Sequence, residues 1–159
     1  KELAMVDLNI KTLHFFTKRM IAFYEERGMK GAVLNVASSA GLIPAGPYMA
    51  AYYAGKSYVA SLTRAVACEL KNKKSGIYLG CLCPGPVDTE FNAHADVKTP
   101  LKGMTAEKCV DITLKGMKKR KTVILPGLSI RLLAVFGRFL PESLYIRMVG
   151  RQQYRKLGK

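Results

Sequence analysis

The sequence lacks the cysteine and histidine patterns that bind structural metals or build a disulfide framework. Its four cysteines include no Cys-x-x-Cys pair, and its two histidines, His14 and His94, lie far apart in the chain. Zinc sites and disulfide-rich domains both need such residues at close, regular spacing. We therefore expect no bound metal, and we expect the cysteines to be buried thiols in a reducing compartment.

Long apolar runs are also missing from the sequence. No stretch of 18 consecutive apolar residues occurs, and the first residues do not have the pattern of a secretory signal peptide. The 159 residues are 49% hydrophobic, which is enough apolar material for one folded core. These features predict a cytoplasmic globular protein.

Acidic residues are scarce in the C-terminal part of the chain. Residues 115–159 hold 12 lysines and arginines and one acid, Glu142, so they carry +11 of the net charge of +15. An apolar stripe runs through the same segment, a pattern typical of helices that lie on an anionic membrane surface. It is equally typical of a helix that covers a hydrophobic substrate site or docks on a partner subunit. Nucleic-acid binding is not expected, because no recognition motif accompanies the charge. The stripe consists of Leu128, Leu132, Val135, Phe136 and Phe139.

The spacing of apolar residues predicts alternating helices and strands before this tail. Residues 2–27 have a helical period that stops at Gly28, and residues 31–37 form an apolar run typical of a strand buried on both faces. Such alternation indicates a parallel α/β sheet. We predict one α/β domain over residues 1–126 and a basic, amphipathic helical tail over residues 127–159. The other expected elements are a helix over 49–71, a strand over 77–83, a helix from an N-cap at Thr105 through 117, and a strand over 122–125.

One of the eight tyrosines, Tyr52, is followed four residues later by a lysine, Lys56. Residues at positions i and i+4 lie on one face of a helix, so the ammonium group can lie near the phenol. A phenol with a pKa of about 10 is a poor base at neutral pH. A nearby cation favours the phenolate and lowers that pKa, which makes Tyr52 a candidate general acid/base.

A serine pair precedes this tyrosine and lysine. Residues 35–56, NVASSAGLIPAGPYMAAYYAGK, place Ser38 and Ser39 at the end of an apolar run and Tyr52 and Lys56 at the start of a helical one. This arrangement resembles the Ser…Tyr-x-x-x-Lys signature of the short-chain dehydrogenase/reductase family, and the likeness extends over essentially the whole chain. It implies a partial Rossmann-like, three-layer α/β fold that contains the last three parallel strands of the family's sheet. It also implies an NAD(P)-dependent oxidoreductase that transfers hydride between nicotinamide and a ketone or secondary alcohol.

The resemblance implies roles for four residues. Tyr52 would protonate the carbonyl oxygen or remove the hydroxyl proton, and Lys56 would lower the tyrosine pKa and bind the nicotinamide ribose. Asn9, in the first helix, would hold a water of the proton relay. A serine hydroxyl would hold the substrate oxygen. We favour Ser38, which aligns with the strand end, over Ser39, which has the commoner spacing of 13 residues to the tyrosine. The other serine is then expected to bond to the local backbone.

The same resemblance implies two binding loops. The loop after the second strand would contact the nicotinamide, and the next loop would close over a small carbonyl or alcohol substrate. A hydrophobic substrate would agree with a tail that covers the substrate site. The cofactor would be NADP(H) or NAD(H), with NADP(H) preferred by analogy alone. The expected cofactor-binding residues are Tyr52, Lys56, Pro84, Gly85, Pro86, Val87 and Thr89, and the expected substrate-binding residues are Ser38, Ser39, Tyr48, Phe91 and His94.

A glycine-rich phosphate-binding turn is not found in this sequence. No Gly-x-x-x-Gly-x-Gly or Gly-x-Gly-x-x-Gly follows a predicted strand, although a dinucleotide-binding fold receives the pyrophosphate at such a turn. We therefore expect the chain to be the C-terminal half of a longer, homo-oligomeric enzyme. Alone, it should neither bind the dinucleotide well nor turn over substrate. The strand at 31–37 would then form an unpaired sheet edge.

The main alternative is a non-catalytic basic α/β module that associates with an anionic lipid surface or a partner protein. Its lipid binding should weaken steeply as ionic strength rises.

A serine hydrolase is disfavoured, because the sequence has no Gly-x-Ser-x-Gly elbow and neither histidine has a neighbouring pattern that makes it a base. We expect a cytoplasmic protein, peripheral at the membrane if the tail binds lipid.

Overall fold

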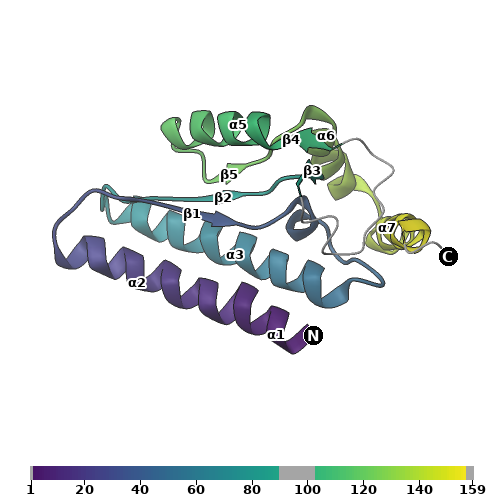
Figure 1. Ribbon diagram of the computed structural model, residues 1–159, viewed down its shortest axis with the longest axis horizontal. Coiled ribbons are helices and arrows are strands. Elements are labelled where there is room, and N and C mark those ends of the chain that lie inside the picture. Colours follow the sequence, from purple (N-terminus) through teal and green to yellow (C-terminus); the bar gives the residue numbers. More distant parts are fainter. Residues whose placement is uncertain (1, 90–102, 157–159) are drawn as a thin grey trace.

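The computed structural model describes residues 2–89 and 103–156 and has helices on both sides of a parallel sheet (Figure 1). It begins with a continuous helical rod made of α1 (Glu2–Val6), the π-helix η1 (Asp7–Thr12) and α2 (Leu13–Glu26). The rod ends just before Gly28, whose φ of +61° lets the chain turn away. The helix predicted over residues 2–27 is confirmed.

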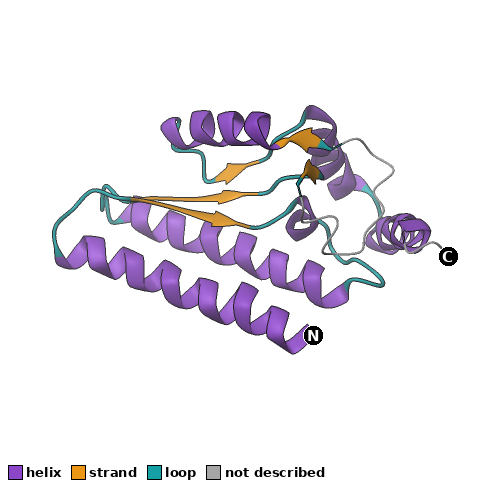
Figure 2. Ribbon diagram, viewed as in Figure 1, coloured by secondary structure: helices purple, strands orange, loops and turns teal. Residues whose placement is uncertain are grey.

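The sheet consists of three parallel strands in the order β1-β2-β5. They are β1 (Ala32–Val36), β2 (Tyr78–Leu82) and β5 (Val123–Ile124). The strands are parallel because helices connect them: α3 (Ala50–Asn72) joins β1 to β2, and α5 (Ala106–Lys118) precedes β5 on the opposite face of the sheet (Figure 2). Among the described residues β1 is an outer strand, as the sequence predicted.

Helices α2 and α3 cover one face of this sheet. The apolar residues of α3 recur every three or four positions and therefore form one stripe that faces the strands. Burial of each large apolar side chain stabilises the fold by about 1.5–3 kcal/mol. One cluster consists of Ile21, Val66, Leu70, Ile77 and Leu79, and a second of Ala37, Val59, Ala60, Cys81 and Cys83.

A chain of buried hydrogen bonds crosses the same interface. The Thr17 hydroxyl of α2 donates to Asn35 Oδ1 of β1 at 3.0 Å, and Asn35 Nδ2 donates to the Thr63 hydroxyl of α3 at 2.9 Å. The Thr63 hydroxyl in turn donates to the carbonyl of Val59 at 2.8 Å. Because all three side chains are buried, each needs these partners. The network thus fixes two helices against the first strand.

Strand β1 is less buried than the sequence predicted. Asn35 faces α2 and α3 through its hydrogen bonds, so Val36 points to the opposite face by the alternation of a strand. There α5 packs on β5, where a Cβ at Gly116 would lie 2.8 Å from Ile124. Val36 remains 50% exposed. The expectation of a strand buried on both faces is therefore wrong for this chain.

The tail is helical from Leu128 onward, as predicted, and a short ladder that the sequence did not reveal lies before it. Strand β3 (Val87–Asp88) pairs in parallel with β4 (Met104–Thr105), and each is too short to show a period. The Thr105 hydroxyl accepts from the N–H of Lys108 at 3.4 Å and caps α5, as expected. The remaining elements are α6 (Leu128–Phe136), η3 (Gly137–Phe139) and α7 (Glu142–Lys156).

None of the helices described is both long and apolar enough to cross a membrane. The described residues also contain no group of three or more His, Cys, Asp or Glu side chains that could hold a metal ion.

Candidate active site

Tyr52 and Lys56 lie one turn apart on α3 and face the same side of the helix. The Lys56 ammonium nitrogen lies 5.8 Å from the centre of the Tyr52 ring. Lys56 Nζ also donates to the carbonyl oxygen of Val36 at 3.2 Å, at the carboxyl end of β1. The i,i+4 spacing therefore brings the two groups together as predicted, and the first strand holds the lysine in place.

The Lys56 ammonium is partly removed from water. This desolvation lowers the pKa of Lys56, while the thiols of Cys81 and Cys83 on β2 act in the opposite direction. A partly desolvated cation interacts more strongly with a neighbouring phenol than an exposed one does, because less water screens it. The position of Lys56 thus suits the tuning of a neighbouring acid/base group.

The serine pair lies in a tight turn directly against α3. Ser38 has an extended backbone and caps the short helix η2 (Ser39–Leu42), and its Oγ accepts from the N–H of Ala40 at 3.2 Å. A Cβ on Gly41 would overlap with the carbonyl oxygen of Lys56. The glycine therefore lets the serine turn reach the helix that carries Tyr52.

The hydrogen bond of Ser38 differs from our expectation for the two serines. We expected the serine that does not bind substrate to bond to the local backbone, but Ser38, the favoured candidate, makes that bond. Ser39 uses its backbone N–H, which donates to the carbonyl of Pro84 at 2.8 Å. Neither serine is fully buried, so both stay candidates for holding a substrate oxygen.

The loop after β2 meets the serine turn through that Pro84 bond. Because Ser38 follows β1 and Pro84 follows β2, both segments lie at the carboxyl edge of the sheet, where ligands of open α/β sheets bind. Pro84, Gly85, Pro86 and Val87 are partly buried, and Thr89 is exposed. A Cβ on Gly85 would lie 2.9 Å from Ile130 of α6. The loop therefore packs against α6, which fixes its course.

Asn9 lies in the π-helical segment of the first helix, a feature that sequence periodicity did not reveal. Ile10, its neighbour in this segment, contacts Gly55 of α3, with 3.8 Å to a Cβ built there. The segment thus packs beside the turn that carries Tyr52 and Lys56. Single turns of π-helix occur frequently at functional sites. The side chain of Asn9 is half-buried and makes no hydrogen bond within the described residues.

Comparison with known proteins identifies the family of the chain. The model of the short chain dehydrogenase family matches residues 3–99. The chain belongs to the short-chain dehydrogenase family. Among curated relatives, the 3beta-hydroxysteroid dehydrogenase of Mediterraneibacter gnavus is 33% identical over 105 residues, which are 65% of this chain and 36% of that protein. Estradiol 17-beta-dehydrogenase 11 of Mus musculus is 29% identical over 134 residues, 81% of this chain and 43% of that protein.

Solved structures of short-chain dehydrogenases are similar in fold. A short-chain dehydrogenase from Sphingobium yanoikuyae in complex with NADPH has a TM-score of 0.70 at 28% identity. The match covers 84% of this chain and 52% of that chain. A 7beta-hydroxysteroid dehydrogenase has a TM-score of 0.74 at 25% identity, with coverage of 92% and 56%. This chain therefore spans about half the length of these structures, and between a third and a half of the two curated relatives.

Helix α7 of this short-chain dehydrogenase chain packs beside the Tyr52 turn. Gln153 Nε2 donates to the hydroxyl of Tyr53 at 2.5 Å, and both residues are buried. Burial raises the pKa of Tyr53, and the Gln153 hydrogen bond opposes this effect. Tyr145 and Val149 of α7 complete a buried cluster with Ala40 and Tyr53. Sequence reasoning missed this support, because a contact across 100 residues leaves no local pattern.

Tyr48, an expected substrate residue, lies at the edge of this helix. Its φ of +68° is unusual for a residue with a side chain, and the residue is 62% exposed. The ring centre lies 5.5 Å from that of Tyr154, and both rings line a shallow cavity of about 460 Å³ beside α7. The other expected substrate residues, Phe91 and His94, lie outside the described residues.

Proposed function

We propose that the chain supplies the catalytic half of an NAD(P)-dependent oxidoreductase that acts on a ketone or secondary alcohol. The observation that carries this proposal is the pairing of Tyr52 with Lys56 on α3, with Lys56 Nζ 5.8 Å from the Tyr52 ring and bonded to the end of β1. The serine turn and the Pro84 loop meet at the same edge of the sheet. The proposal places the substrate carbonyl between these elements.

Tyr52 is the general acid/base of the proposed reaction. In reduction its phenol gives a proton to the carbonyl oxygen as hydride adds to the carbonyl carbon; in oxidation the phenolate removes the hydroxyl proton. The bound nicotinamide supplies or accepts the hydride. Lys56 stabilises the phenolate through its positive charge, and a hydroxyl of Ser38 or Ser39 donates to the oxygen on which negative charge develops. Asn9 is proposed to anchor a water that renews the proton on Tyr52.

The residues present fit the nicotinamide end of a dinucleotide. Lys56 offers an ammonium to the ribose, and the Pro84–Pro86 loop with Val87 and Thr89 offers backbone and hydroxyl groups beside it. Related structures contain NADPH or NADH, so the choice between NADP(H), which we prefer, and NAD(H) stays a proposal. We further propose that the 159 residues alone bind the dinucleotide weakly, since they contain no glycine-rich turn for the pyrophosphate.

The proposed substrate is a small molecule with an apolar body. Support comes from relatives named as hydroxysteroid dehydrogenases and from the paired rings of Tyr48 and Tyr154 beside α7. The cavity that these rings line also has three arginines at its border, Arg147, Arg151 and Arg155. Phe91 and His94 stay candidates for the same pocket. We also propose that the complete protein is a cytoplasmic homo-oligomer.

The decisive experiment compares two adjacent tyrosines in the natural protein that contains this chain. Tyr52→Phe removes the proposed acid/base and should lower kcat by about 10²–10⁴, followed through NAD(P)H absorbance with a panel of secondary alcohols and ketones. Tyr53→Phe removes a hydroxyl from the same helix turn and should leave kcat within about threefold. Full activity of Tyr52→Phe would overturn the proposal.

Cofactor binding of the isolated 159 residues is tested separately by calorimetry with NADPH and NADH. We expect no saturation at millimolar cofactor. Micromolar affinity would contradict the expected weakness of the isolated chain without touching the role of Tyr52.

A second candidate function is association with an anionic lipid surface, independent of catalysis. Helix α6 buries none of its residues, and Leu128, Phe136 and Phe139 are 71%, 64% and 81% exposed. Arg147, Arg151 and Arg155 of α7 are also exposed. Apolar side chains flanked by arginines suit the boundary between headgroups and acyl chains. The protein should sediment with vesicles of phosphatidylglycerol at low salt and stay in the supernatant at high salt. Tyr52→Phe should leave the sedimented fraction unchanged.

A further inference from the structure

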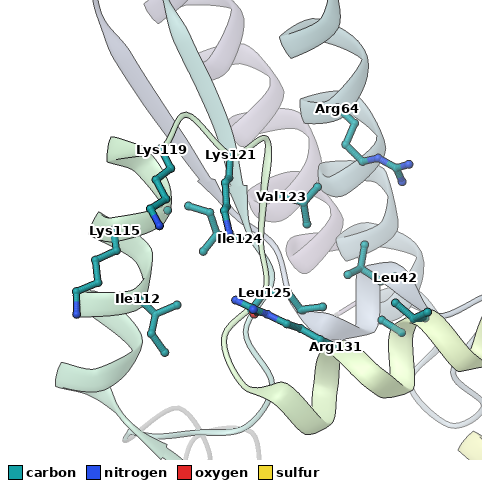
Figure 3. Close-up of a pocket in the computed structure, with 13 residues that line it drawn as sticks. Leu42, Arg64, Ile112, Lys115, Lys119, Lys121, Val123, Ile124, Leu125 and Arg131 are labelled. Carbon is teal, nitrogen blue, oxygen red and sulfur yellow. The ribbon is translucent and has the colours of Figure 1, made fainter.

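A second cavity lies next to β5, at the opposite end of the sheet from β1. Its volume is about 500 Å³, within the range of small-molecule sites. It lies between α5, β5 and α6, with η2 and α3 at its border (Figure 3). None of the described candidate catalytic or cofactor-binding residues lines it, so the redox proposal leaves this space unexplained.

The floor of the cavity is apolar and its walls are fixed by packing. Its apolar side chains come from both helices, the strand and the serine turn. Beside them α5 packs directly on β5, because Gly116 has no side chain and a Cβ there would lie 2.8 Å from Ile124. The side of the cavity formed by α5 and β5 is therefore closely packed. The larger apolar lining residues are Leu42, Ile112, Val123, Ile124, Leu125 and Val135.

The rim of the cavity is positively charged. Five of its lining residues are cations, and none is acidic: they are Arg64, Lys115, Lys119, Lys121 and Arg131. They come from α3, α5, the turn before β5 and α6. In the part of the chain that the structure describes, the ion pairs are Lys11 with Asp7 and Arg19 with Glu26, so none of these five is neutralised. Like charges held around one space repel each other, and an anion bound among them relieves that repulsion.

One of the cations is held in a fixed orientation. Arg131 Nε donates to the carbonyl oxygen of Leu125 at 2.7 Å, which ties the first turn of α6 to the end of β5. The terminal nitrogens of the guanidinium group make no other hydrogen bond within the described residues. Figure 3 shows Arg131, Lys119 and Lys121 directed toward the space between α5 and α6, whereas Arg64 points outward. A guanidinium that is oriented in advance loses less conformational entropy when it binds an anion.

We propose that this cavity binds an anionic amphiphile, with its phosphate group held by Lys119, Lys121 and Arg131 and its apolar chain against the floor. A phosphate group, which carries up to two negative charges, matches several converging cations better than a neutral head group does. The apolar floor excludes a simple inorganic anion as the preferred ligand, because such an ion would leave that surface exposed to water. The site does not depend on the redox proposal.

The test is calorimetric titration of the 159-residue protein with monododecyl phosphate below its critical micelle concentration. We expect saturable binding at one site, with inorganic phosphate and dodecanol each binding at least about tenfold more weakly. The double variant Lys119→Gln/Lys121→Gln should weaken binding of dodecyl phosphate by about tenfold or more. Ile112→Asp, which places a carboxylate on the floor, should weaken it similarly.

A matched variant controls for the overall charge. Lys71→Gln/Lys73→Gln removes two exposed lysines near the end of α3, outside the cavity, and should leave the affinity within about twofold. Equal losses in the two double variants would show that net charge alone attracts the ligand and would overturn the proposal. Equal binding of inorganic phosphate and dodecyl phosphate would overturn it too, because the floor would then have no role.

A vesicle arm separates a free amphiphile from a membrane surface. If the ligand is a single molecule in the cavity, the exposed face of α6 should not contribute to its binding. Phe136→Ser should then leave the affinity for dodecyl phosphate unchanged. Binding to phosphatidylglycerol vesicles without any binding of monomeric dodecyl phosphate would count against the cavity and in favour of surface association. Urea unfolding of every variant serves as the control that the fold is retained.

Discussion

Helices α3 and α6 come from one chain but differ in what their apolar residues do. Helix α3 buries seven of its residues, among them Val59, Val66 and Leu70, whereas α6 buries none and exposes Leu128 and Phe136. Both helices carry an apolar stripe. The stripe of α3 is used to build the core, and therefore it can hold Tyr52 and Lys56 at fixed positions. The stripe of α6 is not used in the core, and it stays available to a ligand, a membrane or a partner.

The largest expected effect tests this difference directly. Leu70 is 4% exposed and Leu132 is 48% exposed. Leu70→Ala should lower the free energy of unfolding by about 2–5 kcal/mol, because it leaves a cavity among packed side chains. Leu132→Ala should change it by less than about 0.5 kcal/mol. Urea unfolding followed by circular dichroism gives both values, and similar losses at the two sites would show that α6 is packed in solution.

The next effect concerns the polar bonds beneath α3. Asn35→Leu keeps a similar volume but removes the acceptor of Thr17 and a donor to Thr63. We expect a loss of about 1–3 kcal/mol in the free energy of unfolding, since a buried hydroxyl is left without a partner. The control is Asn72→Leu at the exposed end of α3, which should be nearly neutral. If Asn35→Leu is neutral as well, the network contributes nothing to holding α2 and α3.

Helix α7 allows a smaller test with adjacent glutamines. Gln153→Ala removes the donor to the Tyr53 hydroxyl and should destabilise the chain by about 1 kcal/mol. It should also raise the pKa of Tyr53 further, because that hydrogen bond opposes the effect of burial. Gln152→Ala is the control, as Gln152 is exposed. Equal thermal midpoints for the two variants would mean that α7 is not fixed by this bond.

The smallest expected effect is a pH dependence that originates at Lys56. Burial lowers its pKa below the ordinary 10.5. Between the lowered pKa and 10.5 the unfolded chain binds more protons than the folded chain, so the free energy of unfolding should rise with pH across that window. Lys56→Met should remove this rise below pH 10.5, and Lys71→Met, at an exposed site, should preserve it. Parallel stability curves for both variants would exclude a buried charge at position 56.

Local signals in the sequence predicted much of the fold. The i,i+4 pair Tyr52 and Lys56, the stop at Gly28 and the cap at Thr105 each depend on neighbours within one or two turns, and all three are found in the structure. The α/β sheet followed from alternating periods of the same short range.

Features that depend on distant segments could not be predicted in this way. The exposure of Val36 depends on which element covers its face, and the bond from Gln153 to Tyr53 joins residues 100 positions apart. The π-helical turn at Asn9 differs from an α-helix by one residue of hydrogen-bond register, which apolar spacing does not resolve. The choice between Ser38 and Ser39 stays open for a related reason, since both lie in one turn and their spacing to Tyr52 differs by a single position.

Gly41 sets a limit on how the site can change. Because position 41 has no side chain, the serine turn can lie directly against the backbone of Lys56 on α3, although glycine itself takes no part in any reaction. An alanine there would push the turn outward, and displacement by about 1 Å can cost a reaction of this kind a hundredfold in rate. A search for variants with altered substrate range should therefore leave position 41 untouched and vary the outer wall around Tyr48 and Tyr154.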